Sequence, residues 1–255
     1  MAELPWLQPE GLHLWISGVL ILASGLTSFL SAALGLGGGI VLLAVMGSVM
    51  PVATMIPVHG VVQVGSNAGR MLIMIRHIRT DILLPFLIGS VVGGVIGGLV
   101  VVRVPSALLQ IGLGAFIIWS TWGRMPTLRS SSLALGGTGL VSTFLTMFFG
   151  ATGVFVAAII KTMKFDRLAH IASHAACMTL QHGIKVMAFG LLGFAFGEYV
   201  PLILAMIVSG VLGTFAGRHV LIKATDERFH TILGWVLTFL ALRLLWQGAS
   251  AMMPA

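Results

Sequence analysis

Repeated apolar runs of helix length constrain the fold of this chain more than any other feature. Several of these runs exceed the roughly 18 residues that mark a membrane-spanning helix, and glycine, proline or charge separates each from the next. Of the 255 residues, 58% are hydrophobic and 8% are charged, which leaves too few polar groups to cover a water-facing surface. We therefore predict an all-α, polytopic integral membrane protein. About ten segments are expected, at 12–34, 37–56, 57–76, 82–102, 106–123, 132–149, 151–163, 168–192, 199–221 and 229–248.

The charged residues predict an orientation for these segments. If Glu3 and Glu10 lie outside, every loop on the inside carries Lys or Arg, whereas the loops on the outside carry only Arg103. Positive residues gather in cytoplasmic loops, so both termini are predicted to lie outside, on the periplasmic face of a cell inner membrane. The net charge of +7 is then explained by orientation and by contact with anionic membrane lipid, and nucleic acid is not expected as a partner.

Two halves of the chain match each other in sequence. Five segments per half is an odd number, so the second half would enter the membrane from the opposite face, as in an inverted-topology repeat. We predict a first repeat at 1–125 and a second at 130–255, within one transmembrane domain. An offset of 115 residues aligns Gly35 with Gly150, Gly38 with Gly153, His59 with His174, and Arg70 with Lys185. An offset of 116 aligns Pro85 with Pro201, Gly94 with Gly210, and Gly97 with Gly213.

Glycine-rich breaks occur at matching places in the two halves. Each break separates apolar segments without any charge, which predicts a broken hairpin in each half, and the sequence leaves open whether these hairpins span or re-enter. A helix that starts at membrane depth presents free N–H groups and the positive end of its dipole, which together suit an anion. The alternative is that the glycines only allow close packing or a tight turn. The candidate binding residues here are Gly35, Gly37, Gly38, Gly39, Gly150, Thr152 and Gly153.

Polar stripes on two helix faces supply the remaining candidate binding residues. Polar side chains inside a membrane are costly unless they face a cavity or a partner, so two stripes at matching positions predict a lined pathway. Alternatives apply to single residues: Arg70 could extend to the inner loop, and the histidines could simply bond to backbone carbonyls. The first stripe is His59, Gln63, Asn67 and Arg70, and the second is His174, Gln181, His182 and Lys185.

The cargo is predicted to be a small anion. All the acidic residues fall in loops or at segment edges, whereas cation pathways commonly use buried carboxylates. Outward movement of an anion across an inside-negative potential is favourable by about 2.3 kcal/mol per charge and 100 mV, and proton coupling through histidine is an alternative. We expect a transporter and not an enzyme, with no cofactor and no metal.

The second stripe and the glycine break also carry a family resemblance. The sequence Gln181-His182-Gly-Ile-Lys185, followed by Gly190-Leu-Leu-Gly-Phe194, resembles the TauE/SafE family of sulfite exporters, together with the early glycine break and the duplicated architecture. The resemblance covers nearly the whole chain, and it implies export of sulfite, sulfoacetate or a related sulfur anion. Family glycines map onto those between positions 35 and 39, whereas the second break departs from this pattern at Ala151 and Thr152.

Other functions and assemblies stay open at this point. An anion channel would share the charges but lack alternating access. A membrane metal-binding protein could use His170, His174 and His182, although no carboxylate or cysteine near them completes a site. Small residues at four-residue spacing, as in Gly93 and Gly97, suit close helix packing either within the chain or in a homodimer.

Overall fold

The structure is a computed structural model that describes residues 8–9, 12–34, 37–123, 131–219 and 227–253. These residues form ten α-helices and no strand, which confirms the predicted all-α class. Four of the apolar stretches, Leu14–Ala33, Thr80–Val101, Ser132–Phe149 and Phe196–Gly217, are long and apolar enough to cross a membrane. The helices are α1 (Leu14–Leu34), α2 (Gly38–Val49), α3 (Val52–Ile73), α4 (Leu83–Val101), α5 (Ser106–Trp122), α6 (Ser132–Phe149), α7 (Gly153–Thr162), α8 (Arg167–Leu191), α9 (Val200–His219) and α10 (Glu227–Ser250).

The boundary between the second and third apolar segments was predicted wrongly. The apolar pattern predicts it at residues 56–57, beside Pro57, whereas α2 ends at Val49 and α3 begins at Val52. Pro51 immediately precedes α3, where its missing N–H costs nothing because the first helical N–H groups have no partner in the helix. Pro57 lies inside α3. Either proline could mark the boundary between the two helices, and α3 begins after the first of them, Pro51.

Two of the helices, α2 and α7, are short. With 12 and 10 residues they extend about 18 Å and 15 Å, which is less than the roughly 30 Å of a bilayer core. Each follows one of the predicted glycine breaks. Gly37 precedes α2 with a φ of 99°, and Gly150 ends α6 with a φ of 79°, both in the left-handed region that glycine adopts without strain. The glycines therefore separate a long helix from a short one in both halves.

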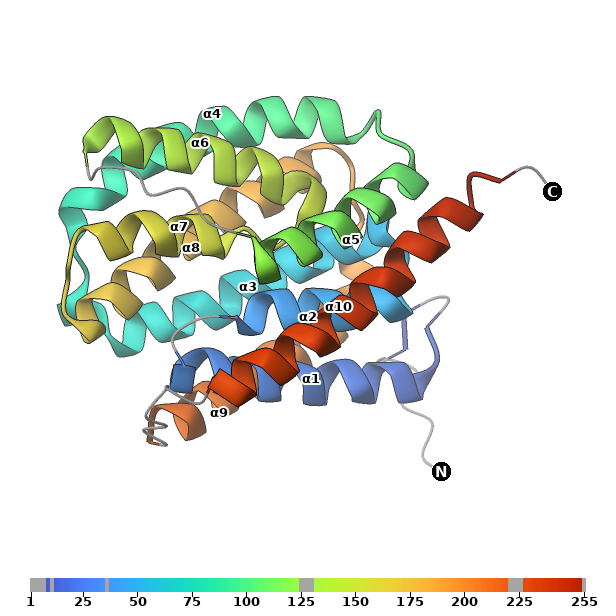
Figure 1. Cartoon of the computed structure of the whole chain (residues 1–255), viewed down its shortest axis with the longest axis horizontal. Helices are drawn as coiled ribbons and strands as arrows, with labels where there is room; N and C mark the ends of the chain where they lie inside the picture. Colours follow the sequence, from blue (N-terminus) through green and yellow to red (C-terminus); the bar gives the residue numbers. More distant parts are fainter. Residues whose placement is uncertain (1–7, 10–11, 35–36, 124–130, 220–226, 254–255) are drawn as a thin grey trace.

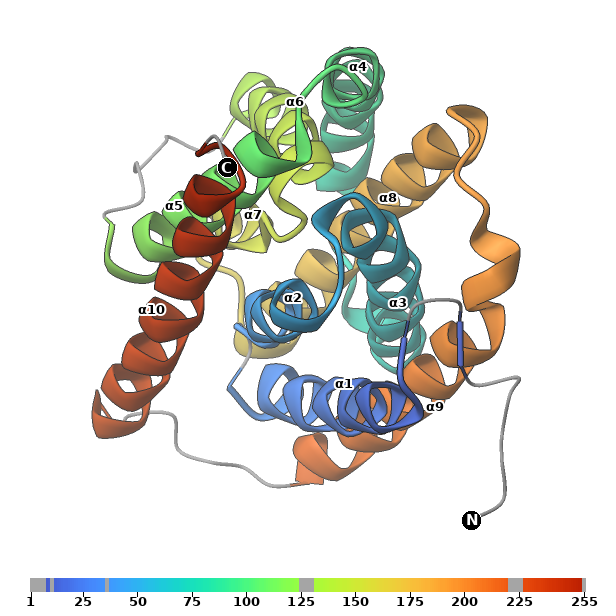
Figure 2. The same cartoon turned by 90° about the vertical axis from the view of Figure 1, so that its right-hand side faces the viewer.

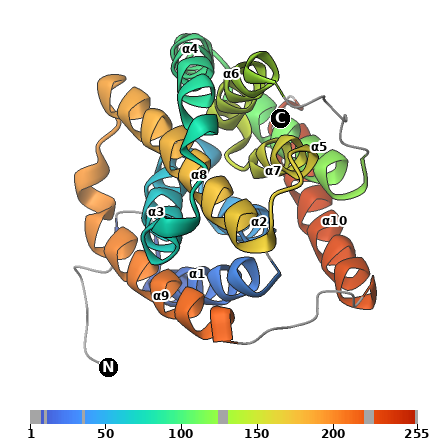
Figure 3. The same ribbon diagram turned by 90° about the vertical axis from the view of Figure 1, so that its left-hand side faces the viewer.

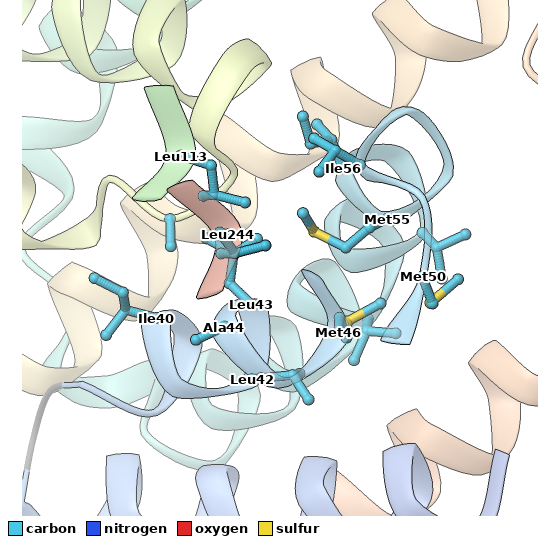
Figure 4. Packing of buried hydrophobic residues seen from close by; sticks show 14 of the residues in the cluster. Ile40, Leu42, Leu43, Ala44, Met46, Met50, Met55, Ile56, Leu113 and Leu244 are labelled. Carbon is cyan, nitrogen blue, oxygen red and sulfur yellow. The ribbon is translucent and has the colours of Figure 1, made fainter. Parts of the chain in front are cut away.

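Apolar packing holds α2 inside the protein. Figure 4 shows its side chains among those of neighbouring helices, with Leu113 of α5 and Leu244 of α10 on one side and Met55 of α3 on another. Leu43 and Met46 of α2 are fully buried. Irregular backbone within a membrane is tolerated where protein covers it. Ala151 and Thr152, at the second break, are buried in this way.

The helices pair in a pattern that is symmetric between the two halves. Helix α1 packs along α9, and α4 packs along α6 (Figure 1). If α1–α5 correspond to α6–α10, these two pairs exchange, while the pairs α3–α8 and α5–α10 map onto themselves. Figure 2 shows α2 and α3 inside the bundle, and Figure 3 shows α8 crossing between the α4–α6 and α1–α9 pairs. The two halves therefore interdigitate in one bundle instead of forming two separate bodies.

Glycines set the closest approaches in these pairs. A Cβ atom built on Gly93 of α4 would collide with the carbonyl of Leu140 in α6, and one on Gly213 of α9 would collide with the carbonyl of Gly25 in α1. The predicted packing role of these small residues is met within the chain, because the helix backbones touch at these glycines.

Candidate functional site

A polar cavity of about 60 Å³ lies where the two short helices begin. That volume is enough for a few water molecules or one small polyatomic ion. No carboxylate is among the described residues that line it. The lining comes from α1, α2, α3, α7, α8 and the glycine breaks, and consists of Ser31, Gly37, Gly39, Ile40, His59, Gln63, Asn67, Arg70, Ala151, Gly153, Val154, His174, Met178 and His182.

The first turns of α2 and α7 both border this cavity. Gly39 and Ile40 contribute from α2, and Gly153 and Val154 contribute from α7. Neither of the residues that precede the two helices caps them with a side-chain hydrogen bond. The N–H groups of a helix start carry partial positive charge, and here two such starts converge on one small space. The cavity therefore has an anion-favouring field before any side-chain charge is counted.

The polar stripe of α3 lines the cavity as a hydrogen-bonded chain. Arg70 Nη1 donates to Asn67 Oδ1 over 3.4 Å, and Asn67 Nδ2 donates to Gln63 Oε1 over 3.0 Å. His59 Nε2 lies 3.1 Å from the Gln63 amide and 3.1 Å from the carbonyl of Gly39. Because a carbonyl can only accept, His59 donates to Gly39. Because this nitrogen carries the proton, it cannot also accept from the Gln63 Nε2 amide, so the chain joins Arg70, Asn67 and Gln63, and His59 is held separately at the start of α2.

The stripe of α8 contributes two histidines to the same cavity. His174 Nε2 donates to the carbonyl of Gly153 over 3.0 Å, so each of the two histidines that the 115-residue offset aligns holds the first turn of the short helix in its own half. His182 also lines the cavity, and its ring meets that of His59 edge to face, with 6.0 Å between the ring centres. His59 and His174 thus each bond to a backbone carbonyl and also line the cavity.

Gln181 and Thr152 lie outside the cavity lining and join helices to one another. Gln181 Nε2 donates to Thr152 Oγ1 over 2.7 Å, and Ser142 of α6 donates to Gln181 Oε1 over 2.9 Å. Thr152 Oγ1 in turn donates to the Ser142 carbonyl over 2.9 Å. The three side chains tie α8 to the break between α6 and α7.

Three predicted glycines are also absent from the described lining. Gly38 donates its N–H to Ser31 Oγ over 3.1 Å, and a Cβ there would collide with the carbonyl of Thr27 in α1. Gly150 packs against Leu43 of α2. Both therefore allow close approach at the breaks. Gly35 falls outside the described residues.

Lys185 does not line the cavity, although its neighbour on the same helix face, His182, does. Its side chain is 0% exposed, and its ammonium has no hydrogen-bond partner in the part of the chain that the structure describes. It crosses α3 at Gly60, where a Cβ would stand 2.6 Å from Lys185 Cε. Only a glycine at position 60 leaves room for this lysine in its present place.

Five cavity residues were not predicted from the sequence. Ser31 carried a usable signal, because the 115-residue offset aligns it with Thr146, and both hydroxyls bond to the backbone at a break. Ser31 Oγ accepts from Gly38, and Thr146 Oγ1 donates to the Gly150 carbonyl over 3.1 Å. The other four are the apolar residues Ile40, Ala151, Val154 and Met178, which nothing in the sequence distinguishes from core residues.

Comparison with known proteins identifies one family. The family model described as "Sulfite exporter TauE/SafE" matches residues 20–244, which is most of the chain. No curated protein and no solved structure matches the chain significantly. The match spans both glycine breaks and both polar stripes.

Proposed function

Because the chain belongs to the sulfite exporter TauE/SafE family, we propose that it exports a small sulfur oxyanion, either sulfite or an organosulfonate such as sulfoacetate. The observation that carries this proposal is the cavity shared by α2, α3, α7 and α8. Two helix starts and the guanidinium of Arg70 border it, and no carboxylate is among its described lining. A site of that composition favours a small anion over a cation.

We further propose that residues 1–125 and 130–255 are inverted repeats that exchange roles during transport. The symmetric pairing of α1 with α9 and of α4 with α6 supports this, since interchange of the halves would turn one pair into the other. The anion site lies where the two halves meet, between α3 and α8. Rocking of the halves about that site would open it to each side in turn.

The export direction follows from the inside-negative potential of an inner membrane, in which both termini are proposed to lie outside. The membrane potential alone would drive export at about 2.3 kcal/mol per charge and 100 mV, so no coupled ion is required. Proton coupling through the cavity histidines is the alternative source of energy.

Transport by a carrier is tested in proteoliposomes that contain the purified protein. Labelled sulfite outside should accumulate transiently against excess unlabelled sulfite inside, and the rate should saturate with concentration. Such saturable counterflow requires a site that faces one side at a time. Flux that rises linearly with concentration and shows no counterflow would favour the anion channel instead.

Arg70 is expected to contribute strongly to binding of the anion. It is 5% exposed, its Nε has no partner among the described residues, and it is the one cation in the described cavity lining. Replacement by methionine should weaken sulfite binding about 10- to 100-fold, since hydrogen bonds to charged groups contribute about 1.5–3 kcal/mol. Binding is measured as the rise in unfolding temperature with sulfite concentration.

The matched control for this change is Arg76→Met, which removes an exposed arginine six residues further along the chain. It should leave the response to sulfite unchanged. If the unfolding temperatures of the two variants rise equally with sulfite, Arg70 does not contribute to the binding site.

A further inference from the structure

A second pocket, of about 350 Å³, lies at the opposite ends of α3 and α8 from the cavity. Ala53 and Ile56 of α3 line it, together with Phe189 and Leu192 of α8. Its volume is large enough for a small anion with some hydration water. The family match and the binding site proposed above assign it no role.

Lys185 stands between this pocket and the polar cavity. Along α8, Phe189 borders the pocket, Lys185 follows one turn away, and His182 borders the cavity. Along α3, Ile56 borders the pocket and His59, three residues further on, borders the cavity beside Gly60. The two helices pack against each other, and Lys185 meets Gly60 at this point. The barrier from His182 to Phe189 is seven residues, or about 10 Å of helix.

Three buried polar atoms gather at this barrier without a partner among the described residues. They are Lys185 Nζ, His59 Nδ1 and His182 Nδ1. Because His59 donates to Gly39 through Nε2, its Nδ1 is an acceptor, which leaves Lys185 and His182 to face an anion. His59 and His182 are in ring contact and both border the cavity, and Lys185 Nζ would stand 3.4 Å from a Cβ on Gly60, the residue after His59. An unpaired buried charge is strongly unfavourable, and a passing anion would compensate it.

We propose that Lys185 and His182 form a second anion station, and that the pocket beyond them, lined by Phe189 and Leu192, is the far mouth of the transport path. Contact of Lys185 with Gly60 closes the path in this structure. Separation of α3 from α8 would bring the ammonium to the anion and open the far mouth. This inference rests on the proposed function, because it adds a route to the anion site.

The route is tested by blocking the far pocket. Leu192→Cys is modified with a membrane-impermeant thiosulfonate that adds a bulky sulfonate, and modification is verified by mass spectrometry. Leu191→Cys is the matched control, because Leu191 is the neighbouring residue, is 89% exposed and is not among the described lining of the pocket. The wild type, whose sole cysteine Cys177 is fully buried, serves as the unmodified background.

Modified Leu192→Cys should lose at least about tenfold of its sulfite counterflow but keep the thermal shift with sulfite, since the cavity is untouched. Modified Leu191→Cys should keep both. Equal counterflow in the two modified variants would overturn the route, and so would loss of the thermal shift together with the counterflow in Leu192→Cys. A wild type with neither thermal shift nor counterflow would instead contradict the proposed function.

Discussion

Replacing Lys185 by methionine is expected to reduce sulfite transport about a hundredfold and to leave sulfite binding in the cavity intact. Lys185 is not among the described cavity residues, but it stands between the cavity and the far pocket. Loss of one partner from a desolvated charge pair costs about 2–5 kcal/mol, and a hundredfold lies within that range. Transport is measured as counterflow in proteoliposomes, and binding as the thermal shift with sulfite.

Stability separates this effect from misfolding. Replacing a buried, unpaired charge by an apolar side chain of similar length should leave the unfolding temperature unchanged or raise it. A folded protein that binds sulfite and fails to move it is the expected phenotype. Arg243→Met is the control, because Arg243 is an exposed cation on another helix, α10, and it should transport normally. Normal transport by Lys185→Met would remove Lys185 from the path.

Gly153→Val is expected to abolish both binding and transport. A Cβ on Gly153 would stand 3.4 Å from His174 Nε2 and 3.5 Å from the Met178 side chain, which is ordinary contact, so the helix can accept it. The new side chain would extend among groups that line a cavity of about 60 Å³. The expected result is no thermal shift with sulfite and no counterflow, in contrast to Lys185→Met.

The control for this change is Gly183→Val in α8, where a Cβ would meet nothing within 4 Å. This change also places a β-branched residue in a helix, with the same intrinsic loss of helix stability, but it adds no atoms to the cavity. Sulfite binding by Gly153→Val at the wild-type level would show that the anion does not occupy the start of α7.

Much of the fold followed from the sequence because single physical rules govern it. Apolar length and glycine breaks identify helices and their ends, which is why α4 and α5 were found almost at their observed bounds. The break at Met50–Pro51 was missed because two prolines in close succession satisfy the same rule, and only packing decides between them. Side chains of α2 pack against α3, α5 and α10, and none of these long-range contacts is visible in a local pattern.

The site was predictable where helical spacing determines a shared face. His59, Gln63, Asn67 and Arg70 follow one face of α3, and all four reach the cavity. Spacing does not show what a neighbouring helix brings to that face. Lys185 shares a face of α8 with His182, yet it does not line the cavity. Its side chain lies against α3 in the space that Gly60, which has no side chain, leaves open. Met178, which lines the cavity, looks like any core methionine in the sequence.

The central claim is that a small oxyanion binds where α2 and α7 begin. Selenite is the heavier chemical analogue of sulfite, and its selenium atom can be located in a crystal by anomalous scattering. The account predicts one selenium peak within hydrogen-bonding reach of the first turns of α2 and α7 and of Asn67 or Arg70, absent from crystals of Gly153→Val. Protein that transports selenite but shows its only selenium peak away from this cavity would contradict the account.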